Sequence, residues 1–464
     1  MTFSSIEFLF YFLPVVMAVY AVATNRLRNL WLLGASCFFY LFGGGWAIGL
    51  LAAVIAVNWL LGMAVARMAG RMRRFGVAAA IVANLGLLGA FKFLDQIVFL
   101  AASSGLIAPQ ISSVALPIGL SFFTFQAMSY VIDVATGRAQ PLRSPLQFAV
   151  YIAMFPQLVA GPIVRFHEIE HQLARRSLTY DSVSDGAQRF AWGLIKKVLI
   201  ADSVAPLADW AFLDPDRLTT PEAWVGLAAY SIQIYFDFSG YSDMAIGLGQ
   251  MFGFRLPENF KRPYAARSVT DFWRRWHVTL SYWFRDYVYI PMGGNRGTAA
   301  RTGLNLLVVF LATGLWHGAG WTFIVWGLYH GVWLILERVA GWRDRAQRGW
   351  AWIGRGATLL IVMLGWVFFR ADSLPDAADY LAALFGAAEA AEWGRMPMDH
   401  RCWAALAVGC VVFVLPGTLS VGQRLDRDGG PNLWVRLAVC CVLLPYALSI
   451  VVAETYSPFL YFRF

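Results

Sequence analysis

Residues 301–338 read RTGLNLLVVFLATGLWHGAGWTFIVWGLYHGVWLILER and contain two apolar runs, 303–316 and 319–337. Glu337 is the only charged residue in these two runs. A helix needs about 20 apolar residues to cross the hydrocarbon core of a bilayer, and both runs come close to that length. They meet at WHG, residues 316–318, so the sequence predicts a helical hairpin with these three residues at its tip.

The charges on either side of this hairpin predict its orientation. Arg296 and Arg301 precede the first run, and a segment rich in arginine begins at Arg338 after the second. Lys and Arg are enriched in cytoplasmic loops, so both ends of the hairpin are predicted inside the cell. From Arg301 to His317 a helix rises about 24 Å at 1.5 Å per residue. His317 is therefore predicted to lie well inside a hydrocarbon layer of about 30 Å.

The apolar character extends over nearly the whole chain. Of its 464 residues, 59% are hydrophobic and 14% are charged, whereas a soluble domain has about 25% charged residues. A soluble protein of this length cannot bury so much apolar surface, but a bilayer acts as an apolar solvent for it. The composition predicts one all-α domain over 1–464, a polytopic transmembrane helical bundle. The residues that could carry chemistry fall within a core over about 114–340.

About ten to twelve segments are apolar enough to be membrane segments. Several of them are shorter than a full span, so they must tilt or be shielded by neighbouring protein. The predicted segments are 6–23, 30–42, 46–66, 76–93, 114–135, 187–212, 222–250, 303–316, 319–337, 356–370, 403–421 and 433–453.

Charged flanks predict the topology of two further segments. The run 6–23 begins with the acid Glu7, whereas a secretory signal begins with basic residues, so it is predicted to stay as the first helix. Arg26 and Arg28 follow it, which predicts a periplasmic N-terminus. The segment 145–164 lies between two basic loops and is interrupted by Pro and Gly. It is predicted to be a re-entrant segment, which must be shielded by protein or line a cavity.

The remaining composition excludes several classes of function. The net charge is +9, but the basic residues lie in short loops between apolar runs, so nucleic acid is not a predicted partner. The five cysteines have no metal-ligand spacing, so neither a metal site nor a disulfide is predicted. Acidic residues gather in 371–402, which is predicted to be the one sizeable outer loop.

Two histidines in apolar surroundings are the candidate catalytic residues. His317 lies at the hairpin tip, and His277 follows the aromatic and cationic stretch 272–276. Ionisable side chains at membrane depth usually face the bundle interior or an aqueous cavity, and imidazole both accepts and releases protons near neutral pH. The alternative for each is a structural histidine that hydrogen-bonds between helices. His330 is predicted to be structural, and His167, His171 and His400 are predicted to be solvated.

A second candidate constellation is YFDFSGYSD, residues 235–243, whose acids Asp237 and Asp243 stand in an apolar run. Buried carboxylates need cationic partners. Two interpretations stay open: a polar lining for a tunnel, or an internal ion-pair network that orients helices. No GxSxG elbow, P-loop or HEXXH motif is present in the sequence. Arg274, Arg275 or Arg285 are available as partners for these acids.

In their order along the chain, these features resemble the membrane-bound O-acyltransferase family, closest to the branch that contains the membrane subunit of bacterial alginate O-acetylation. The resemblance covers nearly the full length. Its marks are PIGLSFFTFQ at 117–126, FPQLVAGPI at 155–163, the run from Asp237 to Asp243, Asn259-Phe260 with Pro263-Tyr264, the stretch from Asp271 to Asp286, Trp316-His317-Gly318 and PFLYF at 458–462.

The resemblance implies a helical bundle that encloses a tunnel across the bilayer, with His317 as the essential catalytic residue and His277 as a second family histidine. It implies that an acyl thioester enters from the cytoplasm and an acceptor hydroxyl from the other side. Relatives in this branch serve alginate, cellulose, other exopolysaccharides and peptidoglycan, and a more distant branch moves D-alanine onto teichoic acids. The polymer is therefore left open.

The residues fit this chemistry. A neutral imidazole at His317 accepts the proton of a hydroxyl, which then attacks the thioester. His277 orients the acceptor, polarises the carbonyl or bridges to His317 through water, and all three roles stay open. The basic residues around Arg274 attract the phosphates of acetyl-CoA or are simply part of a cytoplasmic loop. The predicted substrate-binding residues are Trp273, Arg274, Trp276, Trp316, Trp321, Asp237, Asp243 and Asn259.

The predicted activity is transfer of an acetyl group from acetyl-CoA for O-acetylation of an extracellular polysaccharide such as alginate, with no tightly bound cofactor. The acceptor is the polymer or a periplasmic acetyltransferase partner, and the location is the bacterial inner membrane. One alternative is D-alanyl or other acyl transfer by the same fold. Another is a transporter or polymer-export scaffold without chemistry, but the inverted repeats common in transporters do not stand out here.

Overall fold

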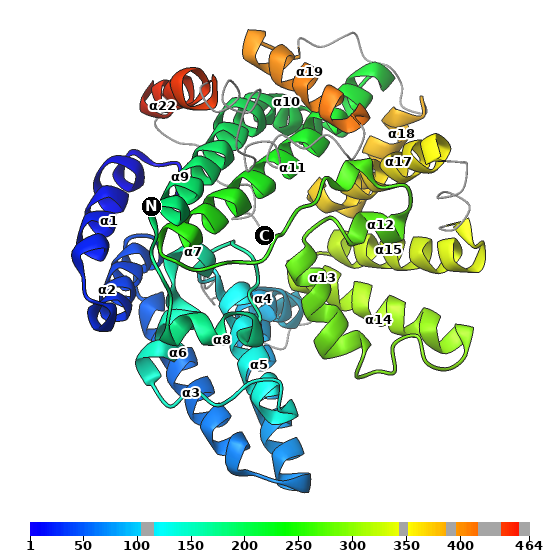
Figure 1. The fold of residues 1–464 in the computed structure, drawn as a ribbon. Helices are drawn as coiled ribbons and strands as arrows, with labels where there is room; N and C mark the ends of the chain where they lie inside the picture. Colours follow the sequence, from blue (N-terminus) through cyan, green and yellow to red (C-terminus); the bar gives the residue numbers. More distant parts are fainter. Residues whose placement is uncertain (104–115, 343–350, 387–395, 416–437, 454–464) are drawn as a thin grey trace. The chain divides into compact units, whose positions relative to one another are not determined.

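The computed structural model describes residues 1–103, 116–342, 351–386, 396–415 and 438–453, and this part of the chain is helical without a β-strand (Figure 1). The chain divides into two compact units. Unit 1 contains Met1–Ala187 and Ala245–Pro257, and unit 2 contains Gln188–Met244 and Glu258–Phe464. The all-α fold class is confirmed, and a single domain over 1–464 stays a prediction.

Unit 1 begins with two helical segments that are continuous in the chain, the π-helix η1 (Glu7–Phe12) and α1 (Leu13–Val22). Together they match the first predicted apolar run. The further helices of this unit are α2 (Asn25–Gly44), α3 (Ala47–Arg67), α4 (Gly70–Ser103), α5 (Leu120–Thr136), α6 (Pro145–Ala153), α7 (Phe155–Leu158) and α8 (Phe166–Ala174).

Helix α3 packs against α4 and α5, side by side in Figure 1. Gly62 of α3 allows this contact, because a Cβ there would collide with the ring of Tyr130 of α5. Between α3 and α4, the buried carboxamides of Asn58 and Asn84 exchange two hydrogen bonds of 3.1 and 2.7 Å. Each of these amides is thereby satisfied in an apolar interior, as buried polar groups generally are.

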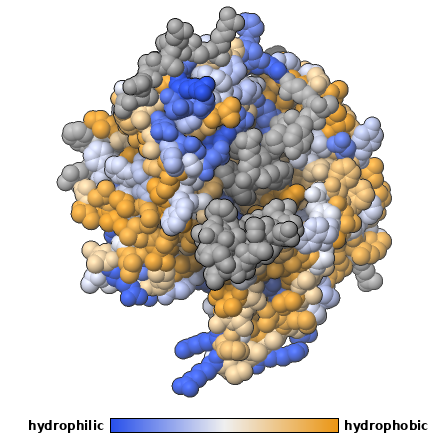
Figure 2. Space-filling view, turned by 180° about the vertical axis from the view of Figure 1, so that it is seen from behind, coloured by the Kyte–Doolittle hydropathy of each residue, from blue (hydrophilic) through white to orange (hydrophobic). Residues whose placement is uncertain are grey.

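The turn between α3 and α4 carries a basic tip. In Figure 2 it is the hydrophilic end at the bottom of the view, next to largely hydrophobic residues. A positive tip on an apolar helical hairpin is typical of the cytoplasmic end of a membrane-embedded pair. The arginines of this tip are Arg67, Arg71, Arg73 and Arg74, and all four are exposed.

The predicted re-entrant segment 145–164 is broken and enclosed. Helix α6 ends at Ala153, the short α7 follows, and the chain then continues without regular structure to α8. All residues in 150–166 are buried, as required for irregular backbone inside a membrane protein. The break and its shielding are confirmed, and entry and exit on the same side of the membrane stay a prediction.

Unit 2 contains the second half of α9 (Tyr180–Ile195), the π-helix η2 (Lys196–Ala201), α10 (Asp202–Leu213) and most of the long α11 (Thr220–Met251). Helices α9 and α11 meet at two glycines, since a Cβ at Gly240 would lie 2.7 Å from the carbonyl oxygen of Gly193. The further helices are α12 (Val269–Trp273), α13 (Val278–Phe284), η5 (Arg285–Tyr289), α14 (Ala299–His317), α15 (Trp321–Val339), α17 (Ala351–Arg370), α18 (Leu374–Leu384), α19 (His400–Val414), η6 (Val439–Leu443) and α22 (Leu444–Ala453), together with two short 3₁₀ turns.

Helices α14 and α15 form the predicted hairpin and run side by side in Figure 1. Gly314 of α14 and Gly327 of α15 let the two backbones touch, because a Cβ at Gly314 would collide with the carbonyl oxygen of Phe323. His317 is the last residue of α14, and Trp321 is the first residue of α15. The hairpin and the position of its tip are confirmed.

Four helices among the described residues are long and apolar enough to cross a membrane, and three shorter apolar helices accompany them. The polytopic membrane bundle is thus confirmed as the fold class. The four are Ala47–Arg67, Gly70–Phe93, Ala299–His317 and Ala351–Arg370, and the shorter ones are Glu7–Val22, His400–Val414 and Val439–Ala453.

Several predicted boundaries differ from the structure. The segment 187–212 is part of a helical run that already begins at Tyr180, and 371–402 contains α18, so it is not only a loop. The outward location of 371–402 stays a prediction. The predicted segments 403–421 and 433–453 extend beyond the described residues, and the motif at 458–462 lies wholly outside them.

Candidate active site

His317 lies in an aromatic enclosure formed by three helices of unit 2. The residue is 6% exposed. Between ring centroids, its imidazole is 4.9 Å from Trp316, 5.2 Å from Trp326 of α15 and 4.9 Å from Phe369 of α17. These rings meet edge to face, an arrangement that aromatic pairs prefer. The enclosure keeps most of the imidazole away from bulk water.

His277 occupies a strained backbone position immediately before α13. Its φ is 42°, and Arg262 is the only other non-glycine residue with positive φ in the described part of the chain. The left-handed conformation costs such a residue about 1–2 kcal/mol, and outliers of this kind cluster at functional sites. The residue is 1% exposed. The N–H of Val278 donates to the carbonyl oxygen of Asn259 (3.0 Å), which helps to hold the turn.

Hydrogen bonds to Asn259 determine which nitrogen of His277 carries the proton. Asn259 Oδ1 accepts from the backbone N–H of Thr279 (3.3 Å) and from Thr279 Oγ1 (2.9 Å), so the carboxamide oxygen must face this side. The same oxygen lies 3.2 Å from His277 Nδ1, which therefore donates and leaves Nε2 as the acceptor nitrogen of the ring. His277 lies outside the candidate spans, and burial lowers its pKa to about 3. The neutral tautomer is thus present at physiological pH.

Trp316 connects the two histidines. Its ring centroid lies 6.1 Å from that of His277 and 4.9 Å from that of His317. The structure therefore brings four predicted site residues into one cluster within unit 2: both histidines, Trp316 and Asn259. Their chemical roles stay predictions.

Trp273 and Trp276 belong to the same buried aromatic network. Trp273 is 5.6 Å from Trp326, and Trp276 is 4.8 Å from Trp366 of α17. Sequence reasoning missed Trp326, Trp366 and Phe369. The spacing of Trp366 and Phe369 places both on one helical face, but nothing in the sequence shows that this face packs on the hairpin tip.

Two predicted site residues lie outside this enclosure. Trp321 is 71% exposed at the start of α15, and Arg274 is exposed directly after α12. A place for Trp321 in a tunnel wall stays a prediction. A role for the exposed guanidinium of Arg274 in binding the phosphates of the donor also stays a prediction.

Asp237 and Asp243 of α11 form ion pairs with cations from the preceding helical run. Asp243 lies 2.9 Å from Arg189 and 2.6 Å from Lys196, and Asp237 lies 3.1 Å from Lys197. This arrangement matches the ion-pair interpretation, in which the acids orient helices. A part in lining a tunnel stays a prediction.

The three arginines that were available as partners for these acids lie elsewhere in the structure. Arg275 pairs with Asp271 four residues before it (2.8 Å), and Arg285 pairs with the adjacent Asp286 (2.7 Å). Arg274 is exposed, whereas both acids on α11 are mostly buried. The cations come instead from the helix that packs on α11, a contact that no local pattern reveals.

The other histidines differ in their surroundings. His330 is fully buried against Trp273, but neither of its ring nitrogens has a hydrogen-bond partner among the described residues, so its structural role stays a prediction. His171 and His400 are exposed, as predicted. The prediction for His167 is wrong, because its Nδ1 lies 2.8 Å from the buried carboxylate of Asp133 in unit 1.

Comparison with known proteins agrees with the family resemblance of the sequence. The family model described as MBOAT, membrane-bound O-acyltransferase family, matches residues 106–369. A probable alginate O-acetylase AlgI of Azotobacter vinelandii is 40% identical over the whole of both chains. A peptidoglycan O-acetyltransferase of Helicobacter pylori is 34% identical over 100% of this chain and 97% of its own. A teichoic acid D-alanyltransferase of Bacillus subtilis is 27% identical over 54% of this chain and 66% of its own. The span matched by the family model includes both candidate histidines.

Proposed function

The chain belongs to the membrane-bound O-acyltransferase family, and we propose that it moves the acetyl group of acetyl-CoA across the inner membrane for O-acetylation of an extracellular polysaccharide such as alginate. The observation that carries this proposal is the enclosed cluster in which Trp316 connects His317 with His277. Similarity to an alginate O-acetylase over the full length supports the choice of acetyl group and polymer.

In this proposal His317 is the general base. Its imidazole takes the proton of the acceptor hydroxyl while the oxygen attacks the carbonyl carbon of the acetyl thioester. The carbon–sulfur bond then breaks, and the departing thiolate takes the proton from the imidazolium. The products are an acetyl ester and the free thiol of CoA. General-base catalysis of this kind contributes about 10²–10⁴-fold to a rate.

The tautomer of His277 narrows its proposed role. Because Nδ1–H donates to Asn259, the ring presents an acceptor nitrogen, Nε2, at its other side. An acceptor nitrogen does not polarise a carbonyl, since that needs a donor. His277 instead accepts a hydrogen bond from a second donor on the acceptor, such as a neighbouring sugar hydroxyl. This contact orients the attacking hydroxyl, whose own proton goes to His317.

The donor enters from the cytoplasmic face in this proposal. Arg267 and Arg274 are exposed in the basic segment between α11 and α14. Exposed guanidinium groups attract and bind phosphates. They are therefore the proposed binding groups for the phosphates of acetyl-CoA, while the thioester extends toward the histidines.

The proposed topology follows from the distribution of charge. Loops rich in arginine face the cytoplasm, and the N-terminus faces the periplasm. The immediate acceptor is a hydroxyl on the polysaccharide or on a periplasmic acetyltransferase partner. Both present the same chemistry to His317.

The second candidate is transfer of a D-alanyl group by the same residues. Similarity to a teichoic acid D-alanyltransferase favours it, but that similarity covers only 54% of this chain. The two candidates differ in donor and product, so mass spectrometry of the modified polymer separates them. A D-alanyl ester in place of an acetyl ester would replace the first proposal by the second.

The experiment that tests the proposal compares polymer acetylation in cells expressing the wild-type protein, His317→Ala or His171→Ala at equal membrane levels. His317→Ala is expected to lose acetyl esters by at least about 100-fold, the lower bound of general-base catalysis. His171 is exposed and serves as the matched control, which is expected to retain acetylation. Full acetylation by His317→Ala would refute the proposal.

A further inference from the structure

A groove with a cavity volume of about 460 Å³ runs between α15 and α17 of unit 2. This volume lies within the range of about 300–1,000 Å³ that ligand sites occupy. On α15 the lining residues Tyr329, Trp333 and Ala340 share one helical face, and on α17 Ile361 and Leu364 do so. From Tyr329 to Ala340 the helix rises about 16 Å at 1.5 Å per residue. The groove is therefore elongated along the helices, and its lining includes no residue of the aromatic enclosure around His317.

The groove is mostly apolar and opens on the outer surface. Leu336 of α15 and Leu360 of α17 line it, and both residues are exposed. Helix α17 is a candidate span, and α15 is the second arm of the membrane hairpin. An exposed apolar groove on such helices meets the acyl chains of the bilayer rather than water. Its length of about 16 Å is close to half of a hydrocarbon core of about 30 Å, the part that one lipid chain occupies.

Glu337 is the exception in this lining. The residue is 6% exposed, and among the residues that the structure describes its carboxyl oxygens accept only from the backbone N–H of Thr270 (3.4 and 3.2 Å). No cation of the described residues forms an ion pair with it. A buried carboxylate without a positive partner carries a large desolvation cost.

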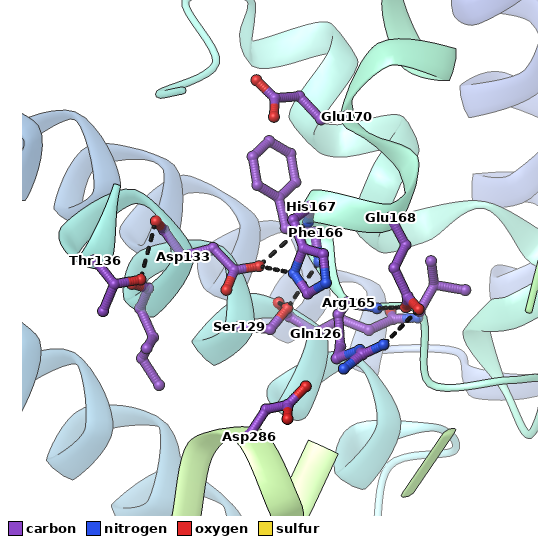
Figure 3. Close-up of polar contacts among 12 residues, drawn as sticks. Gln126, Ser129, Asp133, Thr136, Arg165, Phe166, His167, Glu168, Glu170 and Asp286 are labelled. Carbon is purple, nitrogen blue, oxygen red and sulfur yellow. Dashed lines mark hydrogen bonds and ion pairs between the residues drawn. The ribbon is translucent and has the colours of Figure 1, made fainter. Parts of the chain in front are cut away.

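Two buried acids elsewhere in the chain have such partners within their own unit. Asp133 of unit 1 lies 2.8 Å from Nδ1 of His167 (Figure 3), and Asp237 of unit 2 lies 3.1 Å from Nζ of Lys197. Glu337 instead lines a groove that is open to the outside. The contrast indicates that its positive partner comes from a ligand in this groove.

We propose that the groove binds one acyl chain of a bilayer phospholipid whose head group ends in a primary ammonium, with the ammonium at Glu337. The inference does not depend on the proposed acetyl transfer. The ammonium donates to the carboxylate in a charge-assisted hydrogen bond, which is stronger than a neutral one. Trp333 lies one turn before Glu337 and lines the same groove, so its indole ring adds a cation–π attraction for the ammonium.

The residue after Glu337 fits the phosphate of such a head group. Arg338 is exposed, and its guanidinium donates to Oδ1 of Asn295 (2.9 Å) without a carboxylate partner among the described residues. It is therefore available to a phosphate. The basic residues at this end of α15 predict that it faces the cytoplasm, where the head groups of the inner leaflet lie. A zwitterionic head group matches both the acid and the base, whereas an anionic one matches only the base.

The experiment measures lipid binding to the purified, delipidated full-length protein in detergent by native mass spectrometry. The probes are phosphatidylethanolamine and phosphatidylglycerol with identical acyl chains, of which only the first carries an ammonium. The wild type is expected to bind phosphatidylethanolamine at least about tenfold more tightly, as for one hydrogen bond to a charged group. Equal binding of the two lipids overturns the inference, because apolar contact alone would then explain it.

Glu337→Gln removes the negative charge but keeps the contact with α12, because the amide oxygen of Gln still accepts from the N–H of Thr270. This variant is expected to bind the two lipids equally. Asp379→Asn is the matched control, since Asp379 is an exposed acid of α18 outside the groove, and it is expected to keep the preference. A Glu337→Gln protein that keeps the preference overturns the inference.

Ala357→Phe tests the groove itself, because its larger side chain fills the wall formed by α17 and leaves Glu337 in place. It is expected to weaken the binding of phosphatidylethanolamine at least about tenfold. Wild-type binding by this variant overturns the inference, also where Glu337→Gln does not fold. Self-association of the wild type that Ala357→Phe abolishes, without a lipid preference, assigns the groove to a second copy of the chain and overturns the inference as well.

Discussion

Replacement of Asn259 by alanine tests how the structure holds His277. The substitution removes the acceptor of three hydrogen bonds, from His277 Nδ1 (3.2 Å), Thr279 N (3.3 Å) and Thr279 Oγ1 (2.9 Å). At about 1 kcal/mol for each bond, Asn259→Ala is expected to lower the free energy of unfolding by about 3 kcal/mol. The imidazole also loses the contact that fixes its tautomer. We expect acetyl transfer to slow about tenfold, which corresponds to about 1.4 kcal/mol in the barrier.

The assay pairs thermal unfolding of the purified protein with thiol release from acetyl-CoA in the presence of an acceptor. Thr279→Val is the control, because it removes one of the three bonds and leaves the contact between Asn259 and His277 in place. It is expected to lower stability by about 1 kcal/mol and to retain kcat. As a positioning residue, Asn259 is expected to affect kcat more than the KM for acetyl-CoA. If Asn259→Ala is neither less stable nor slower than Thr279→Val, the argument for the tautomer of His277 fails.

Three further outcomes are expected. Gly314→Ala places a Cβ against the backbone carbonyl oxygen of Phe323 in α15, so it is expected to reduce both stability and acetyl transfer. At Gly303 the atom nearest to an added Cβ is 3.6 Å away, so Gly303→Ala is expected to be tolerated in the same assays. Asp243→Ala removes a carboxylate shared by two cations and is expected to cost about 3–5 kcal/mol of unfolding free energy, measured against Asp214→Ala at the surface. Burial lowers the pKa of His277 from 6.5 to about 3. Between these two pH values the imidazole is protonated in the unfolded chain but neutral in the folded protein. Stability is therefore expected to fall as pH is lowered from 6.5 toward 3, and His277→Gln is expected to weaken that dependence in a thermal-unfolding series.

The hairpin of α14 and α15 was predictable because its determinants are local. Two apolar runs, arginines at both outer ends and a short glycine-containing turn indicate antiparallel membrane helices without reference to any other part of the chain. The position of His317 at the tip follows directly. The broken and enclosed segment 145–164 was predictable for the same reason, since Pro and Gly interrupt an apolar run between two basic loops.

The environment of the histidines was only partly predictable. The left-handed backbone at His277 depends on pairing with Asn259, which lies 18 residues earlier. The ring of Phe369 reaches His317 from a helix that is separate from the hairpin in sequence. Neither contact follows from residue type or spacing, because both depend on which faces meet in the folded unit.

The partners of the acids on α11 illustrate the same limit. A pattern of charge indicated that Asp243 needs cations, and it suggested those in the nearest basic loop. The actual partners are Arg189 and Lys196. They reach Asp243 because glycines at positions 193 and 240 let α9 and α11 approach closely. Close helix packing of this kind is decided by glycines whose significance appears only when both helices are seen together.

The most direct test of a proton-accepting role for His317 is the single-turnover rate of acetyl ester formation from acetyl-CoA, measured in H₂O and in D₂O for the wild type and His317→Gln. The wild type is expected to react more slowly in D₂O, because a proton moves in the step that forms the ester. His317→Gln is expected to react at least about 100-fold more slowly and to show no such solvent dependence. A His317→Gln protein that forms the ester at the wild-type rate would contradict the account.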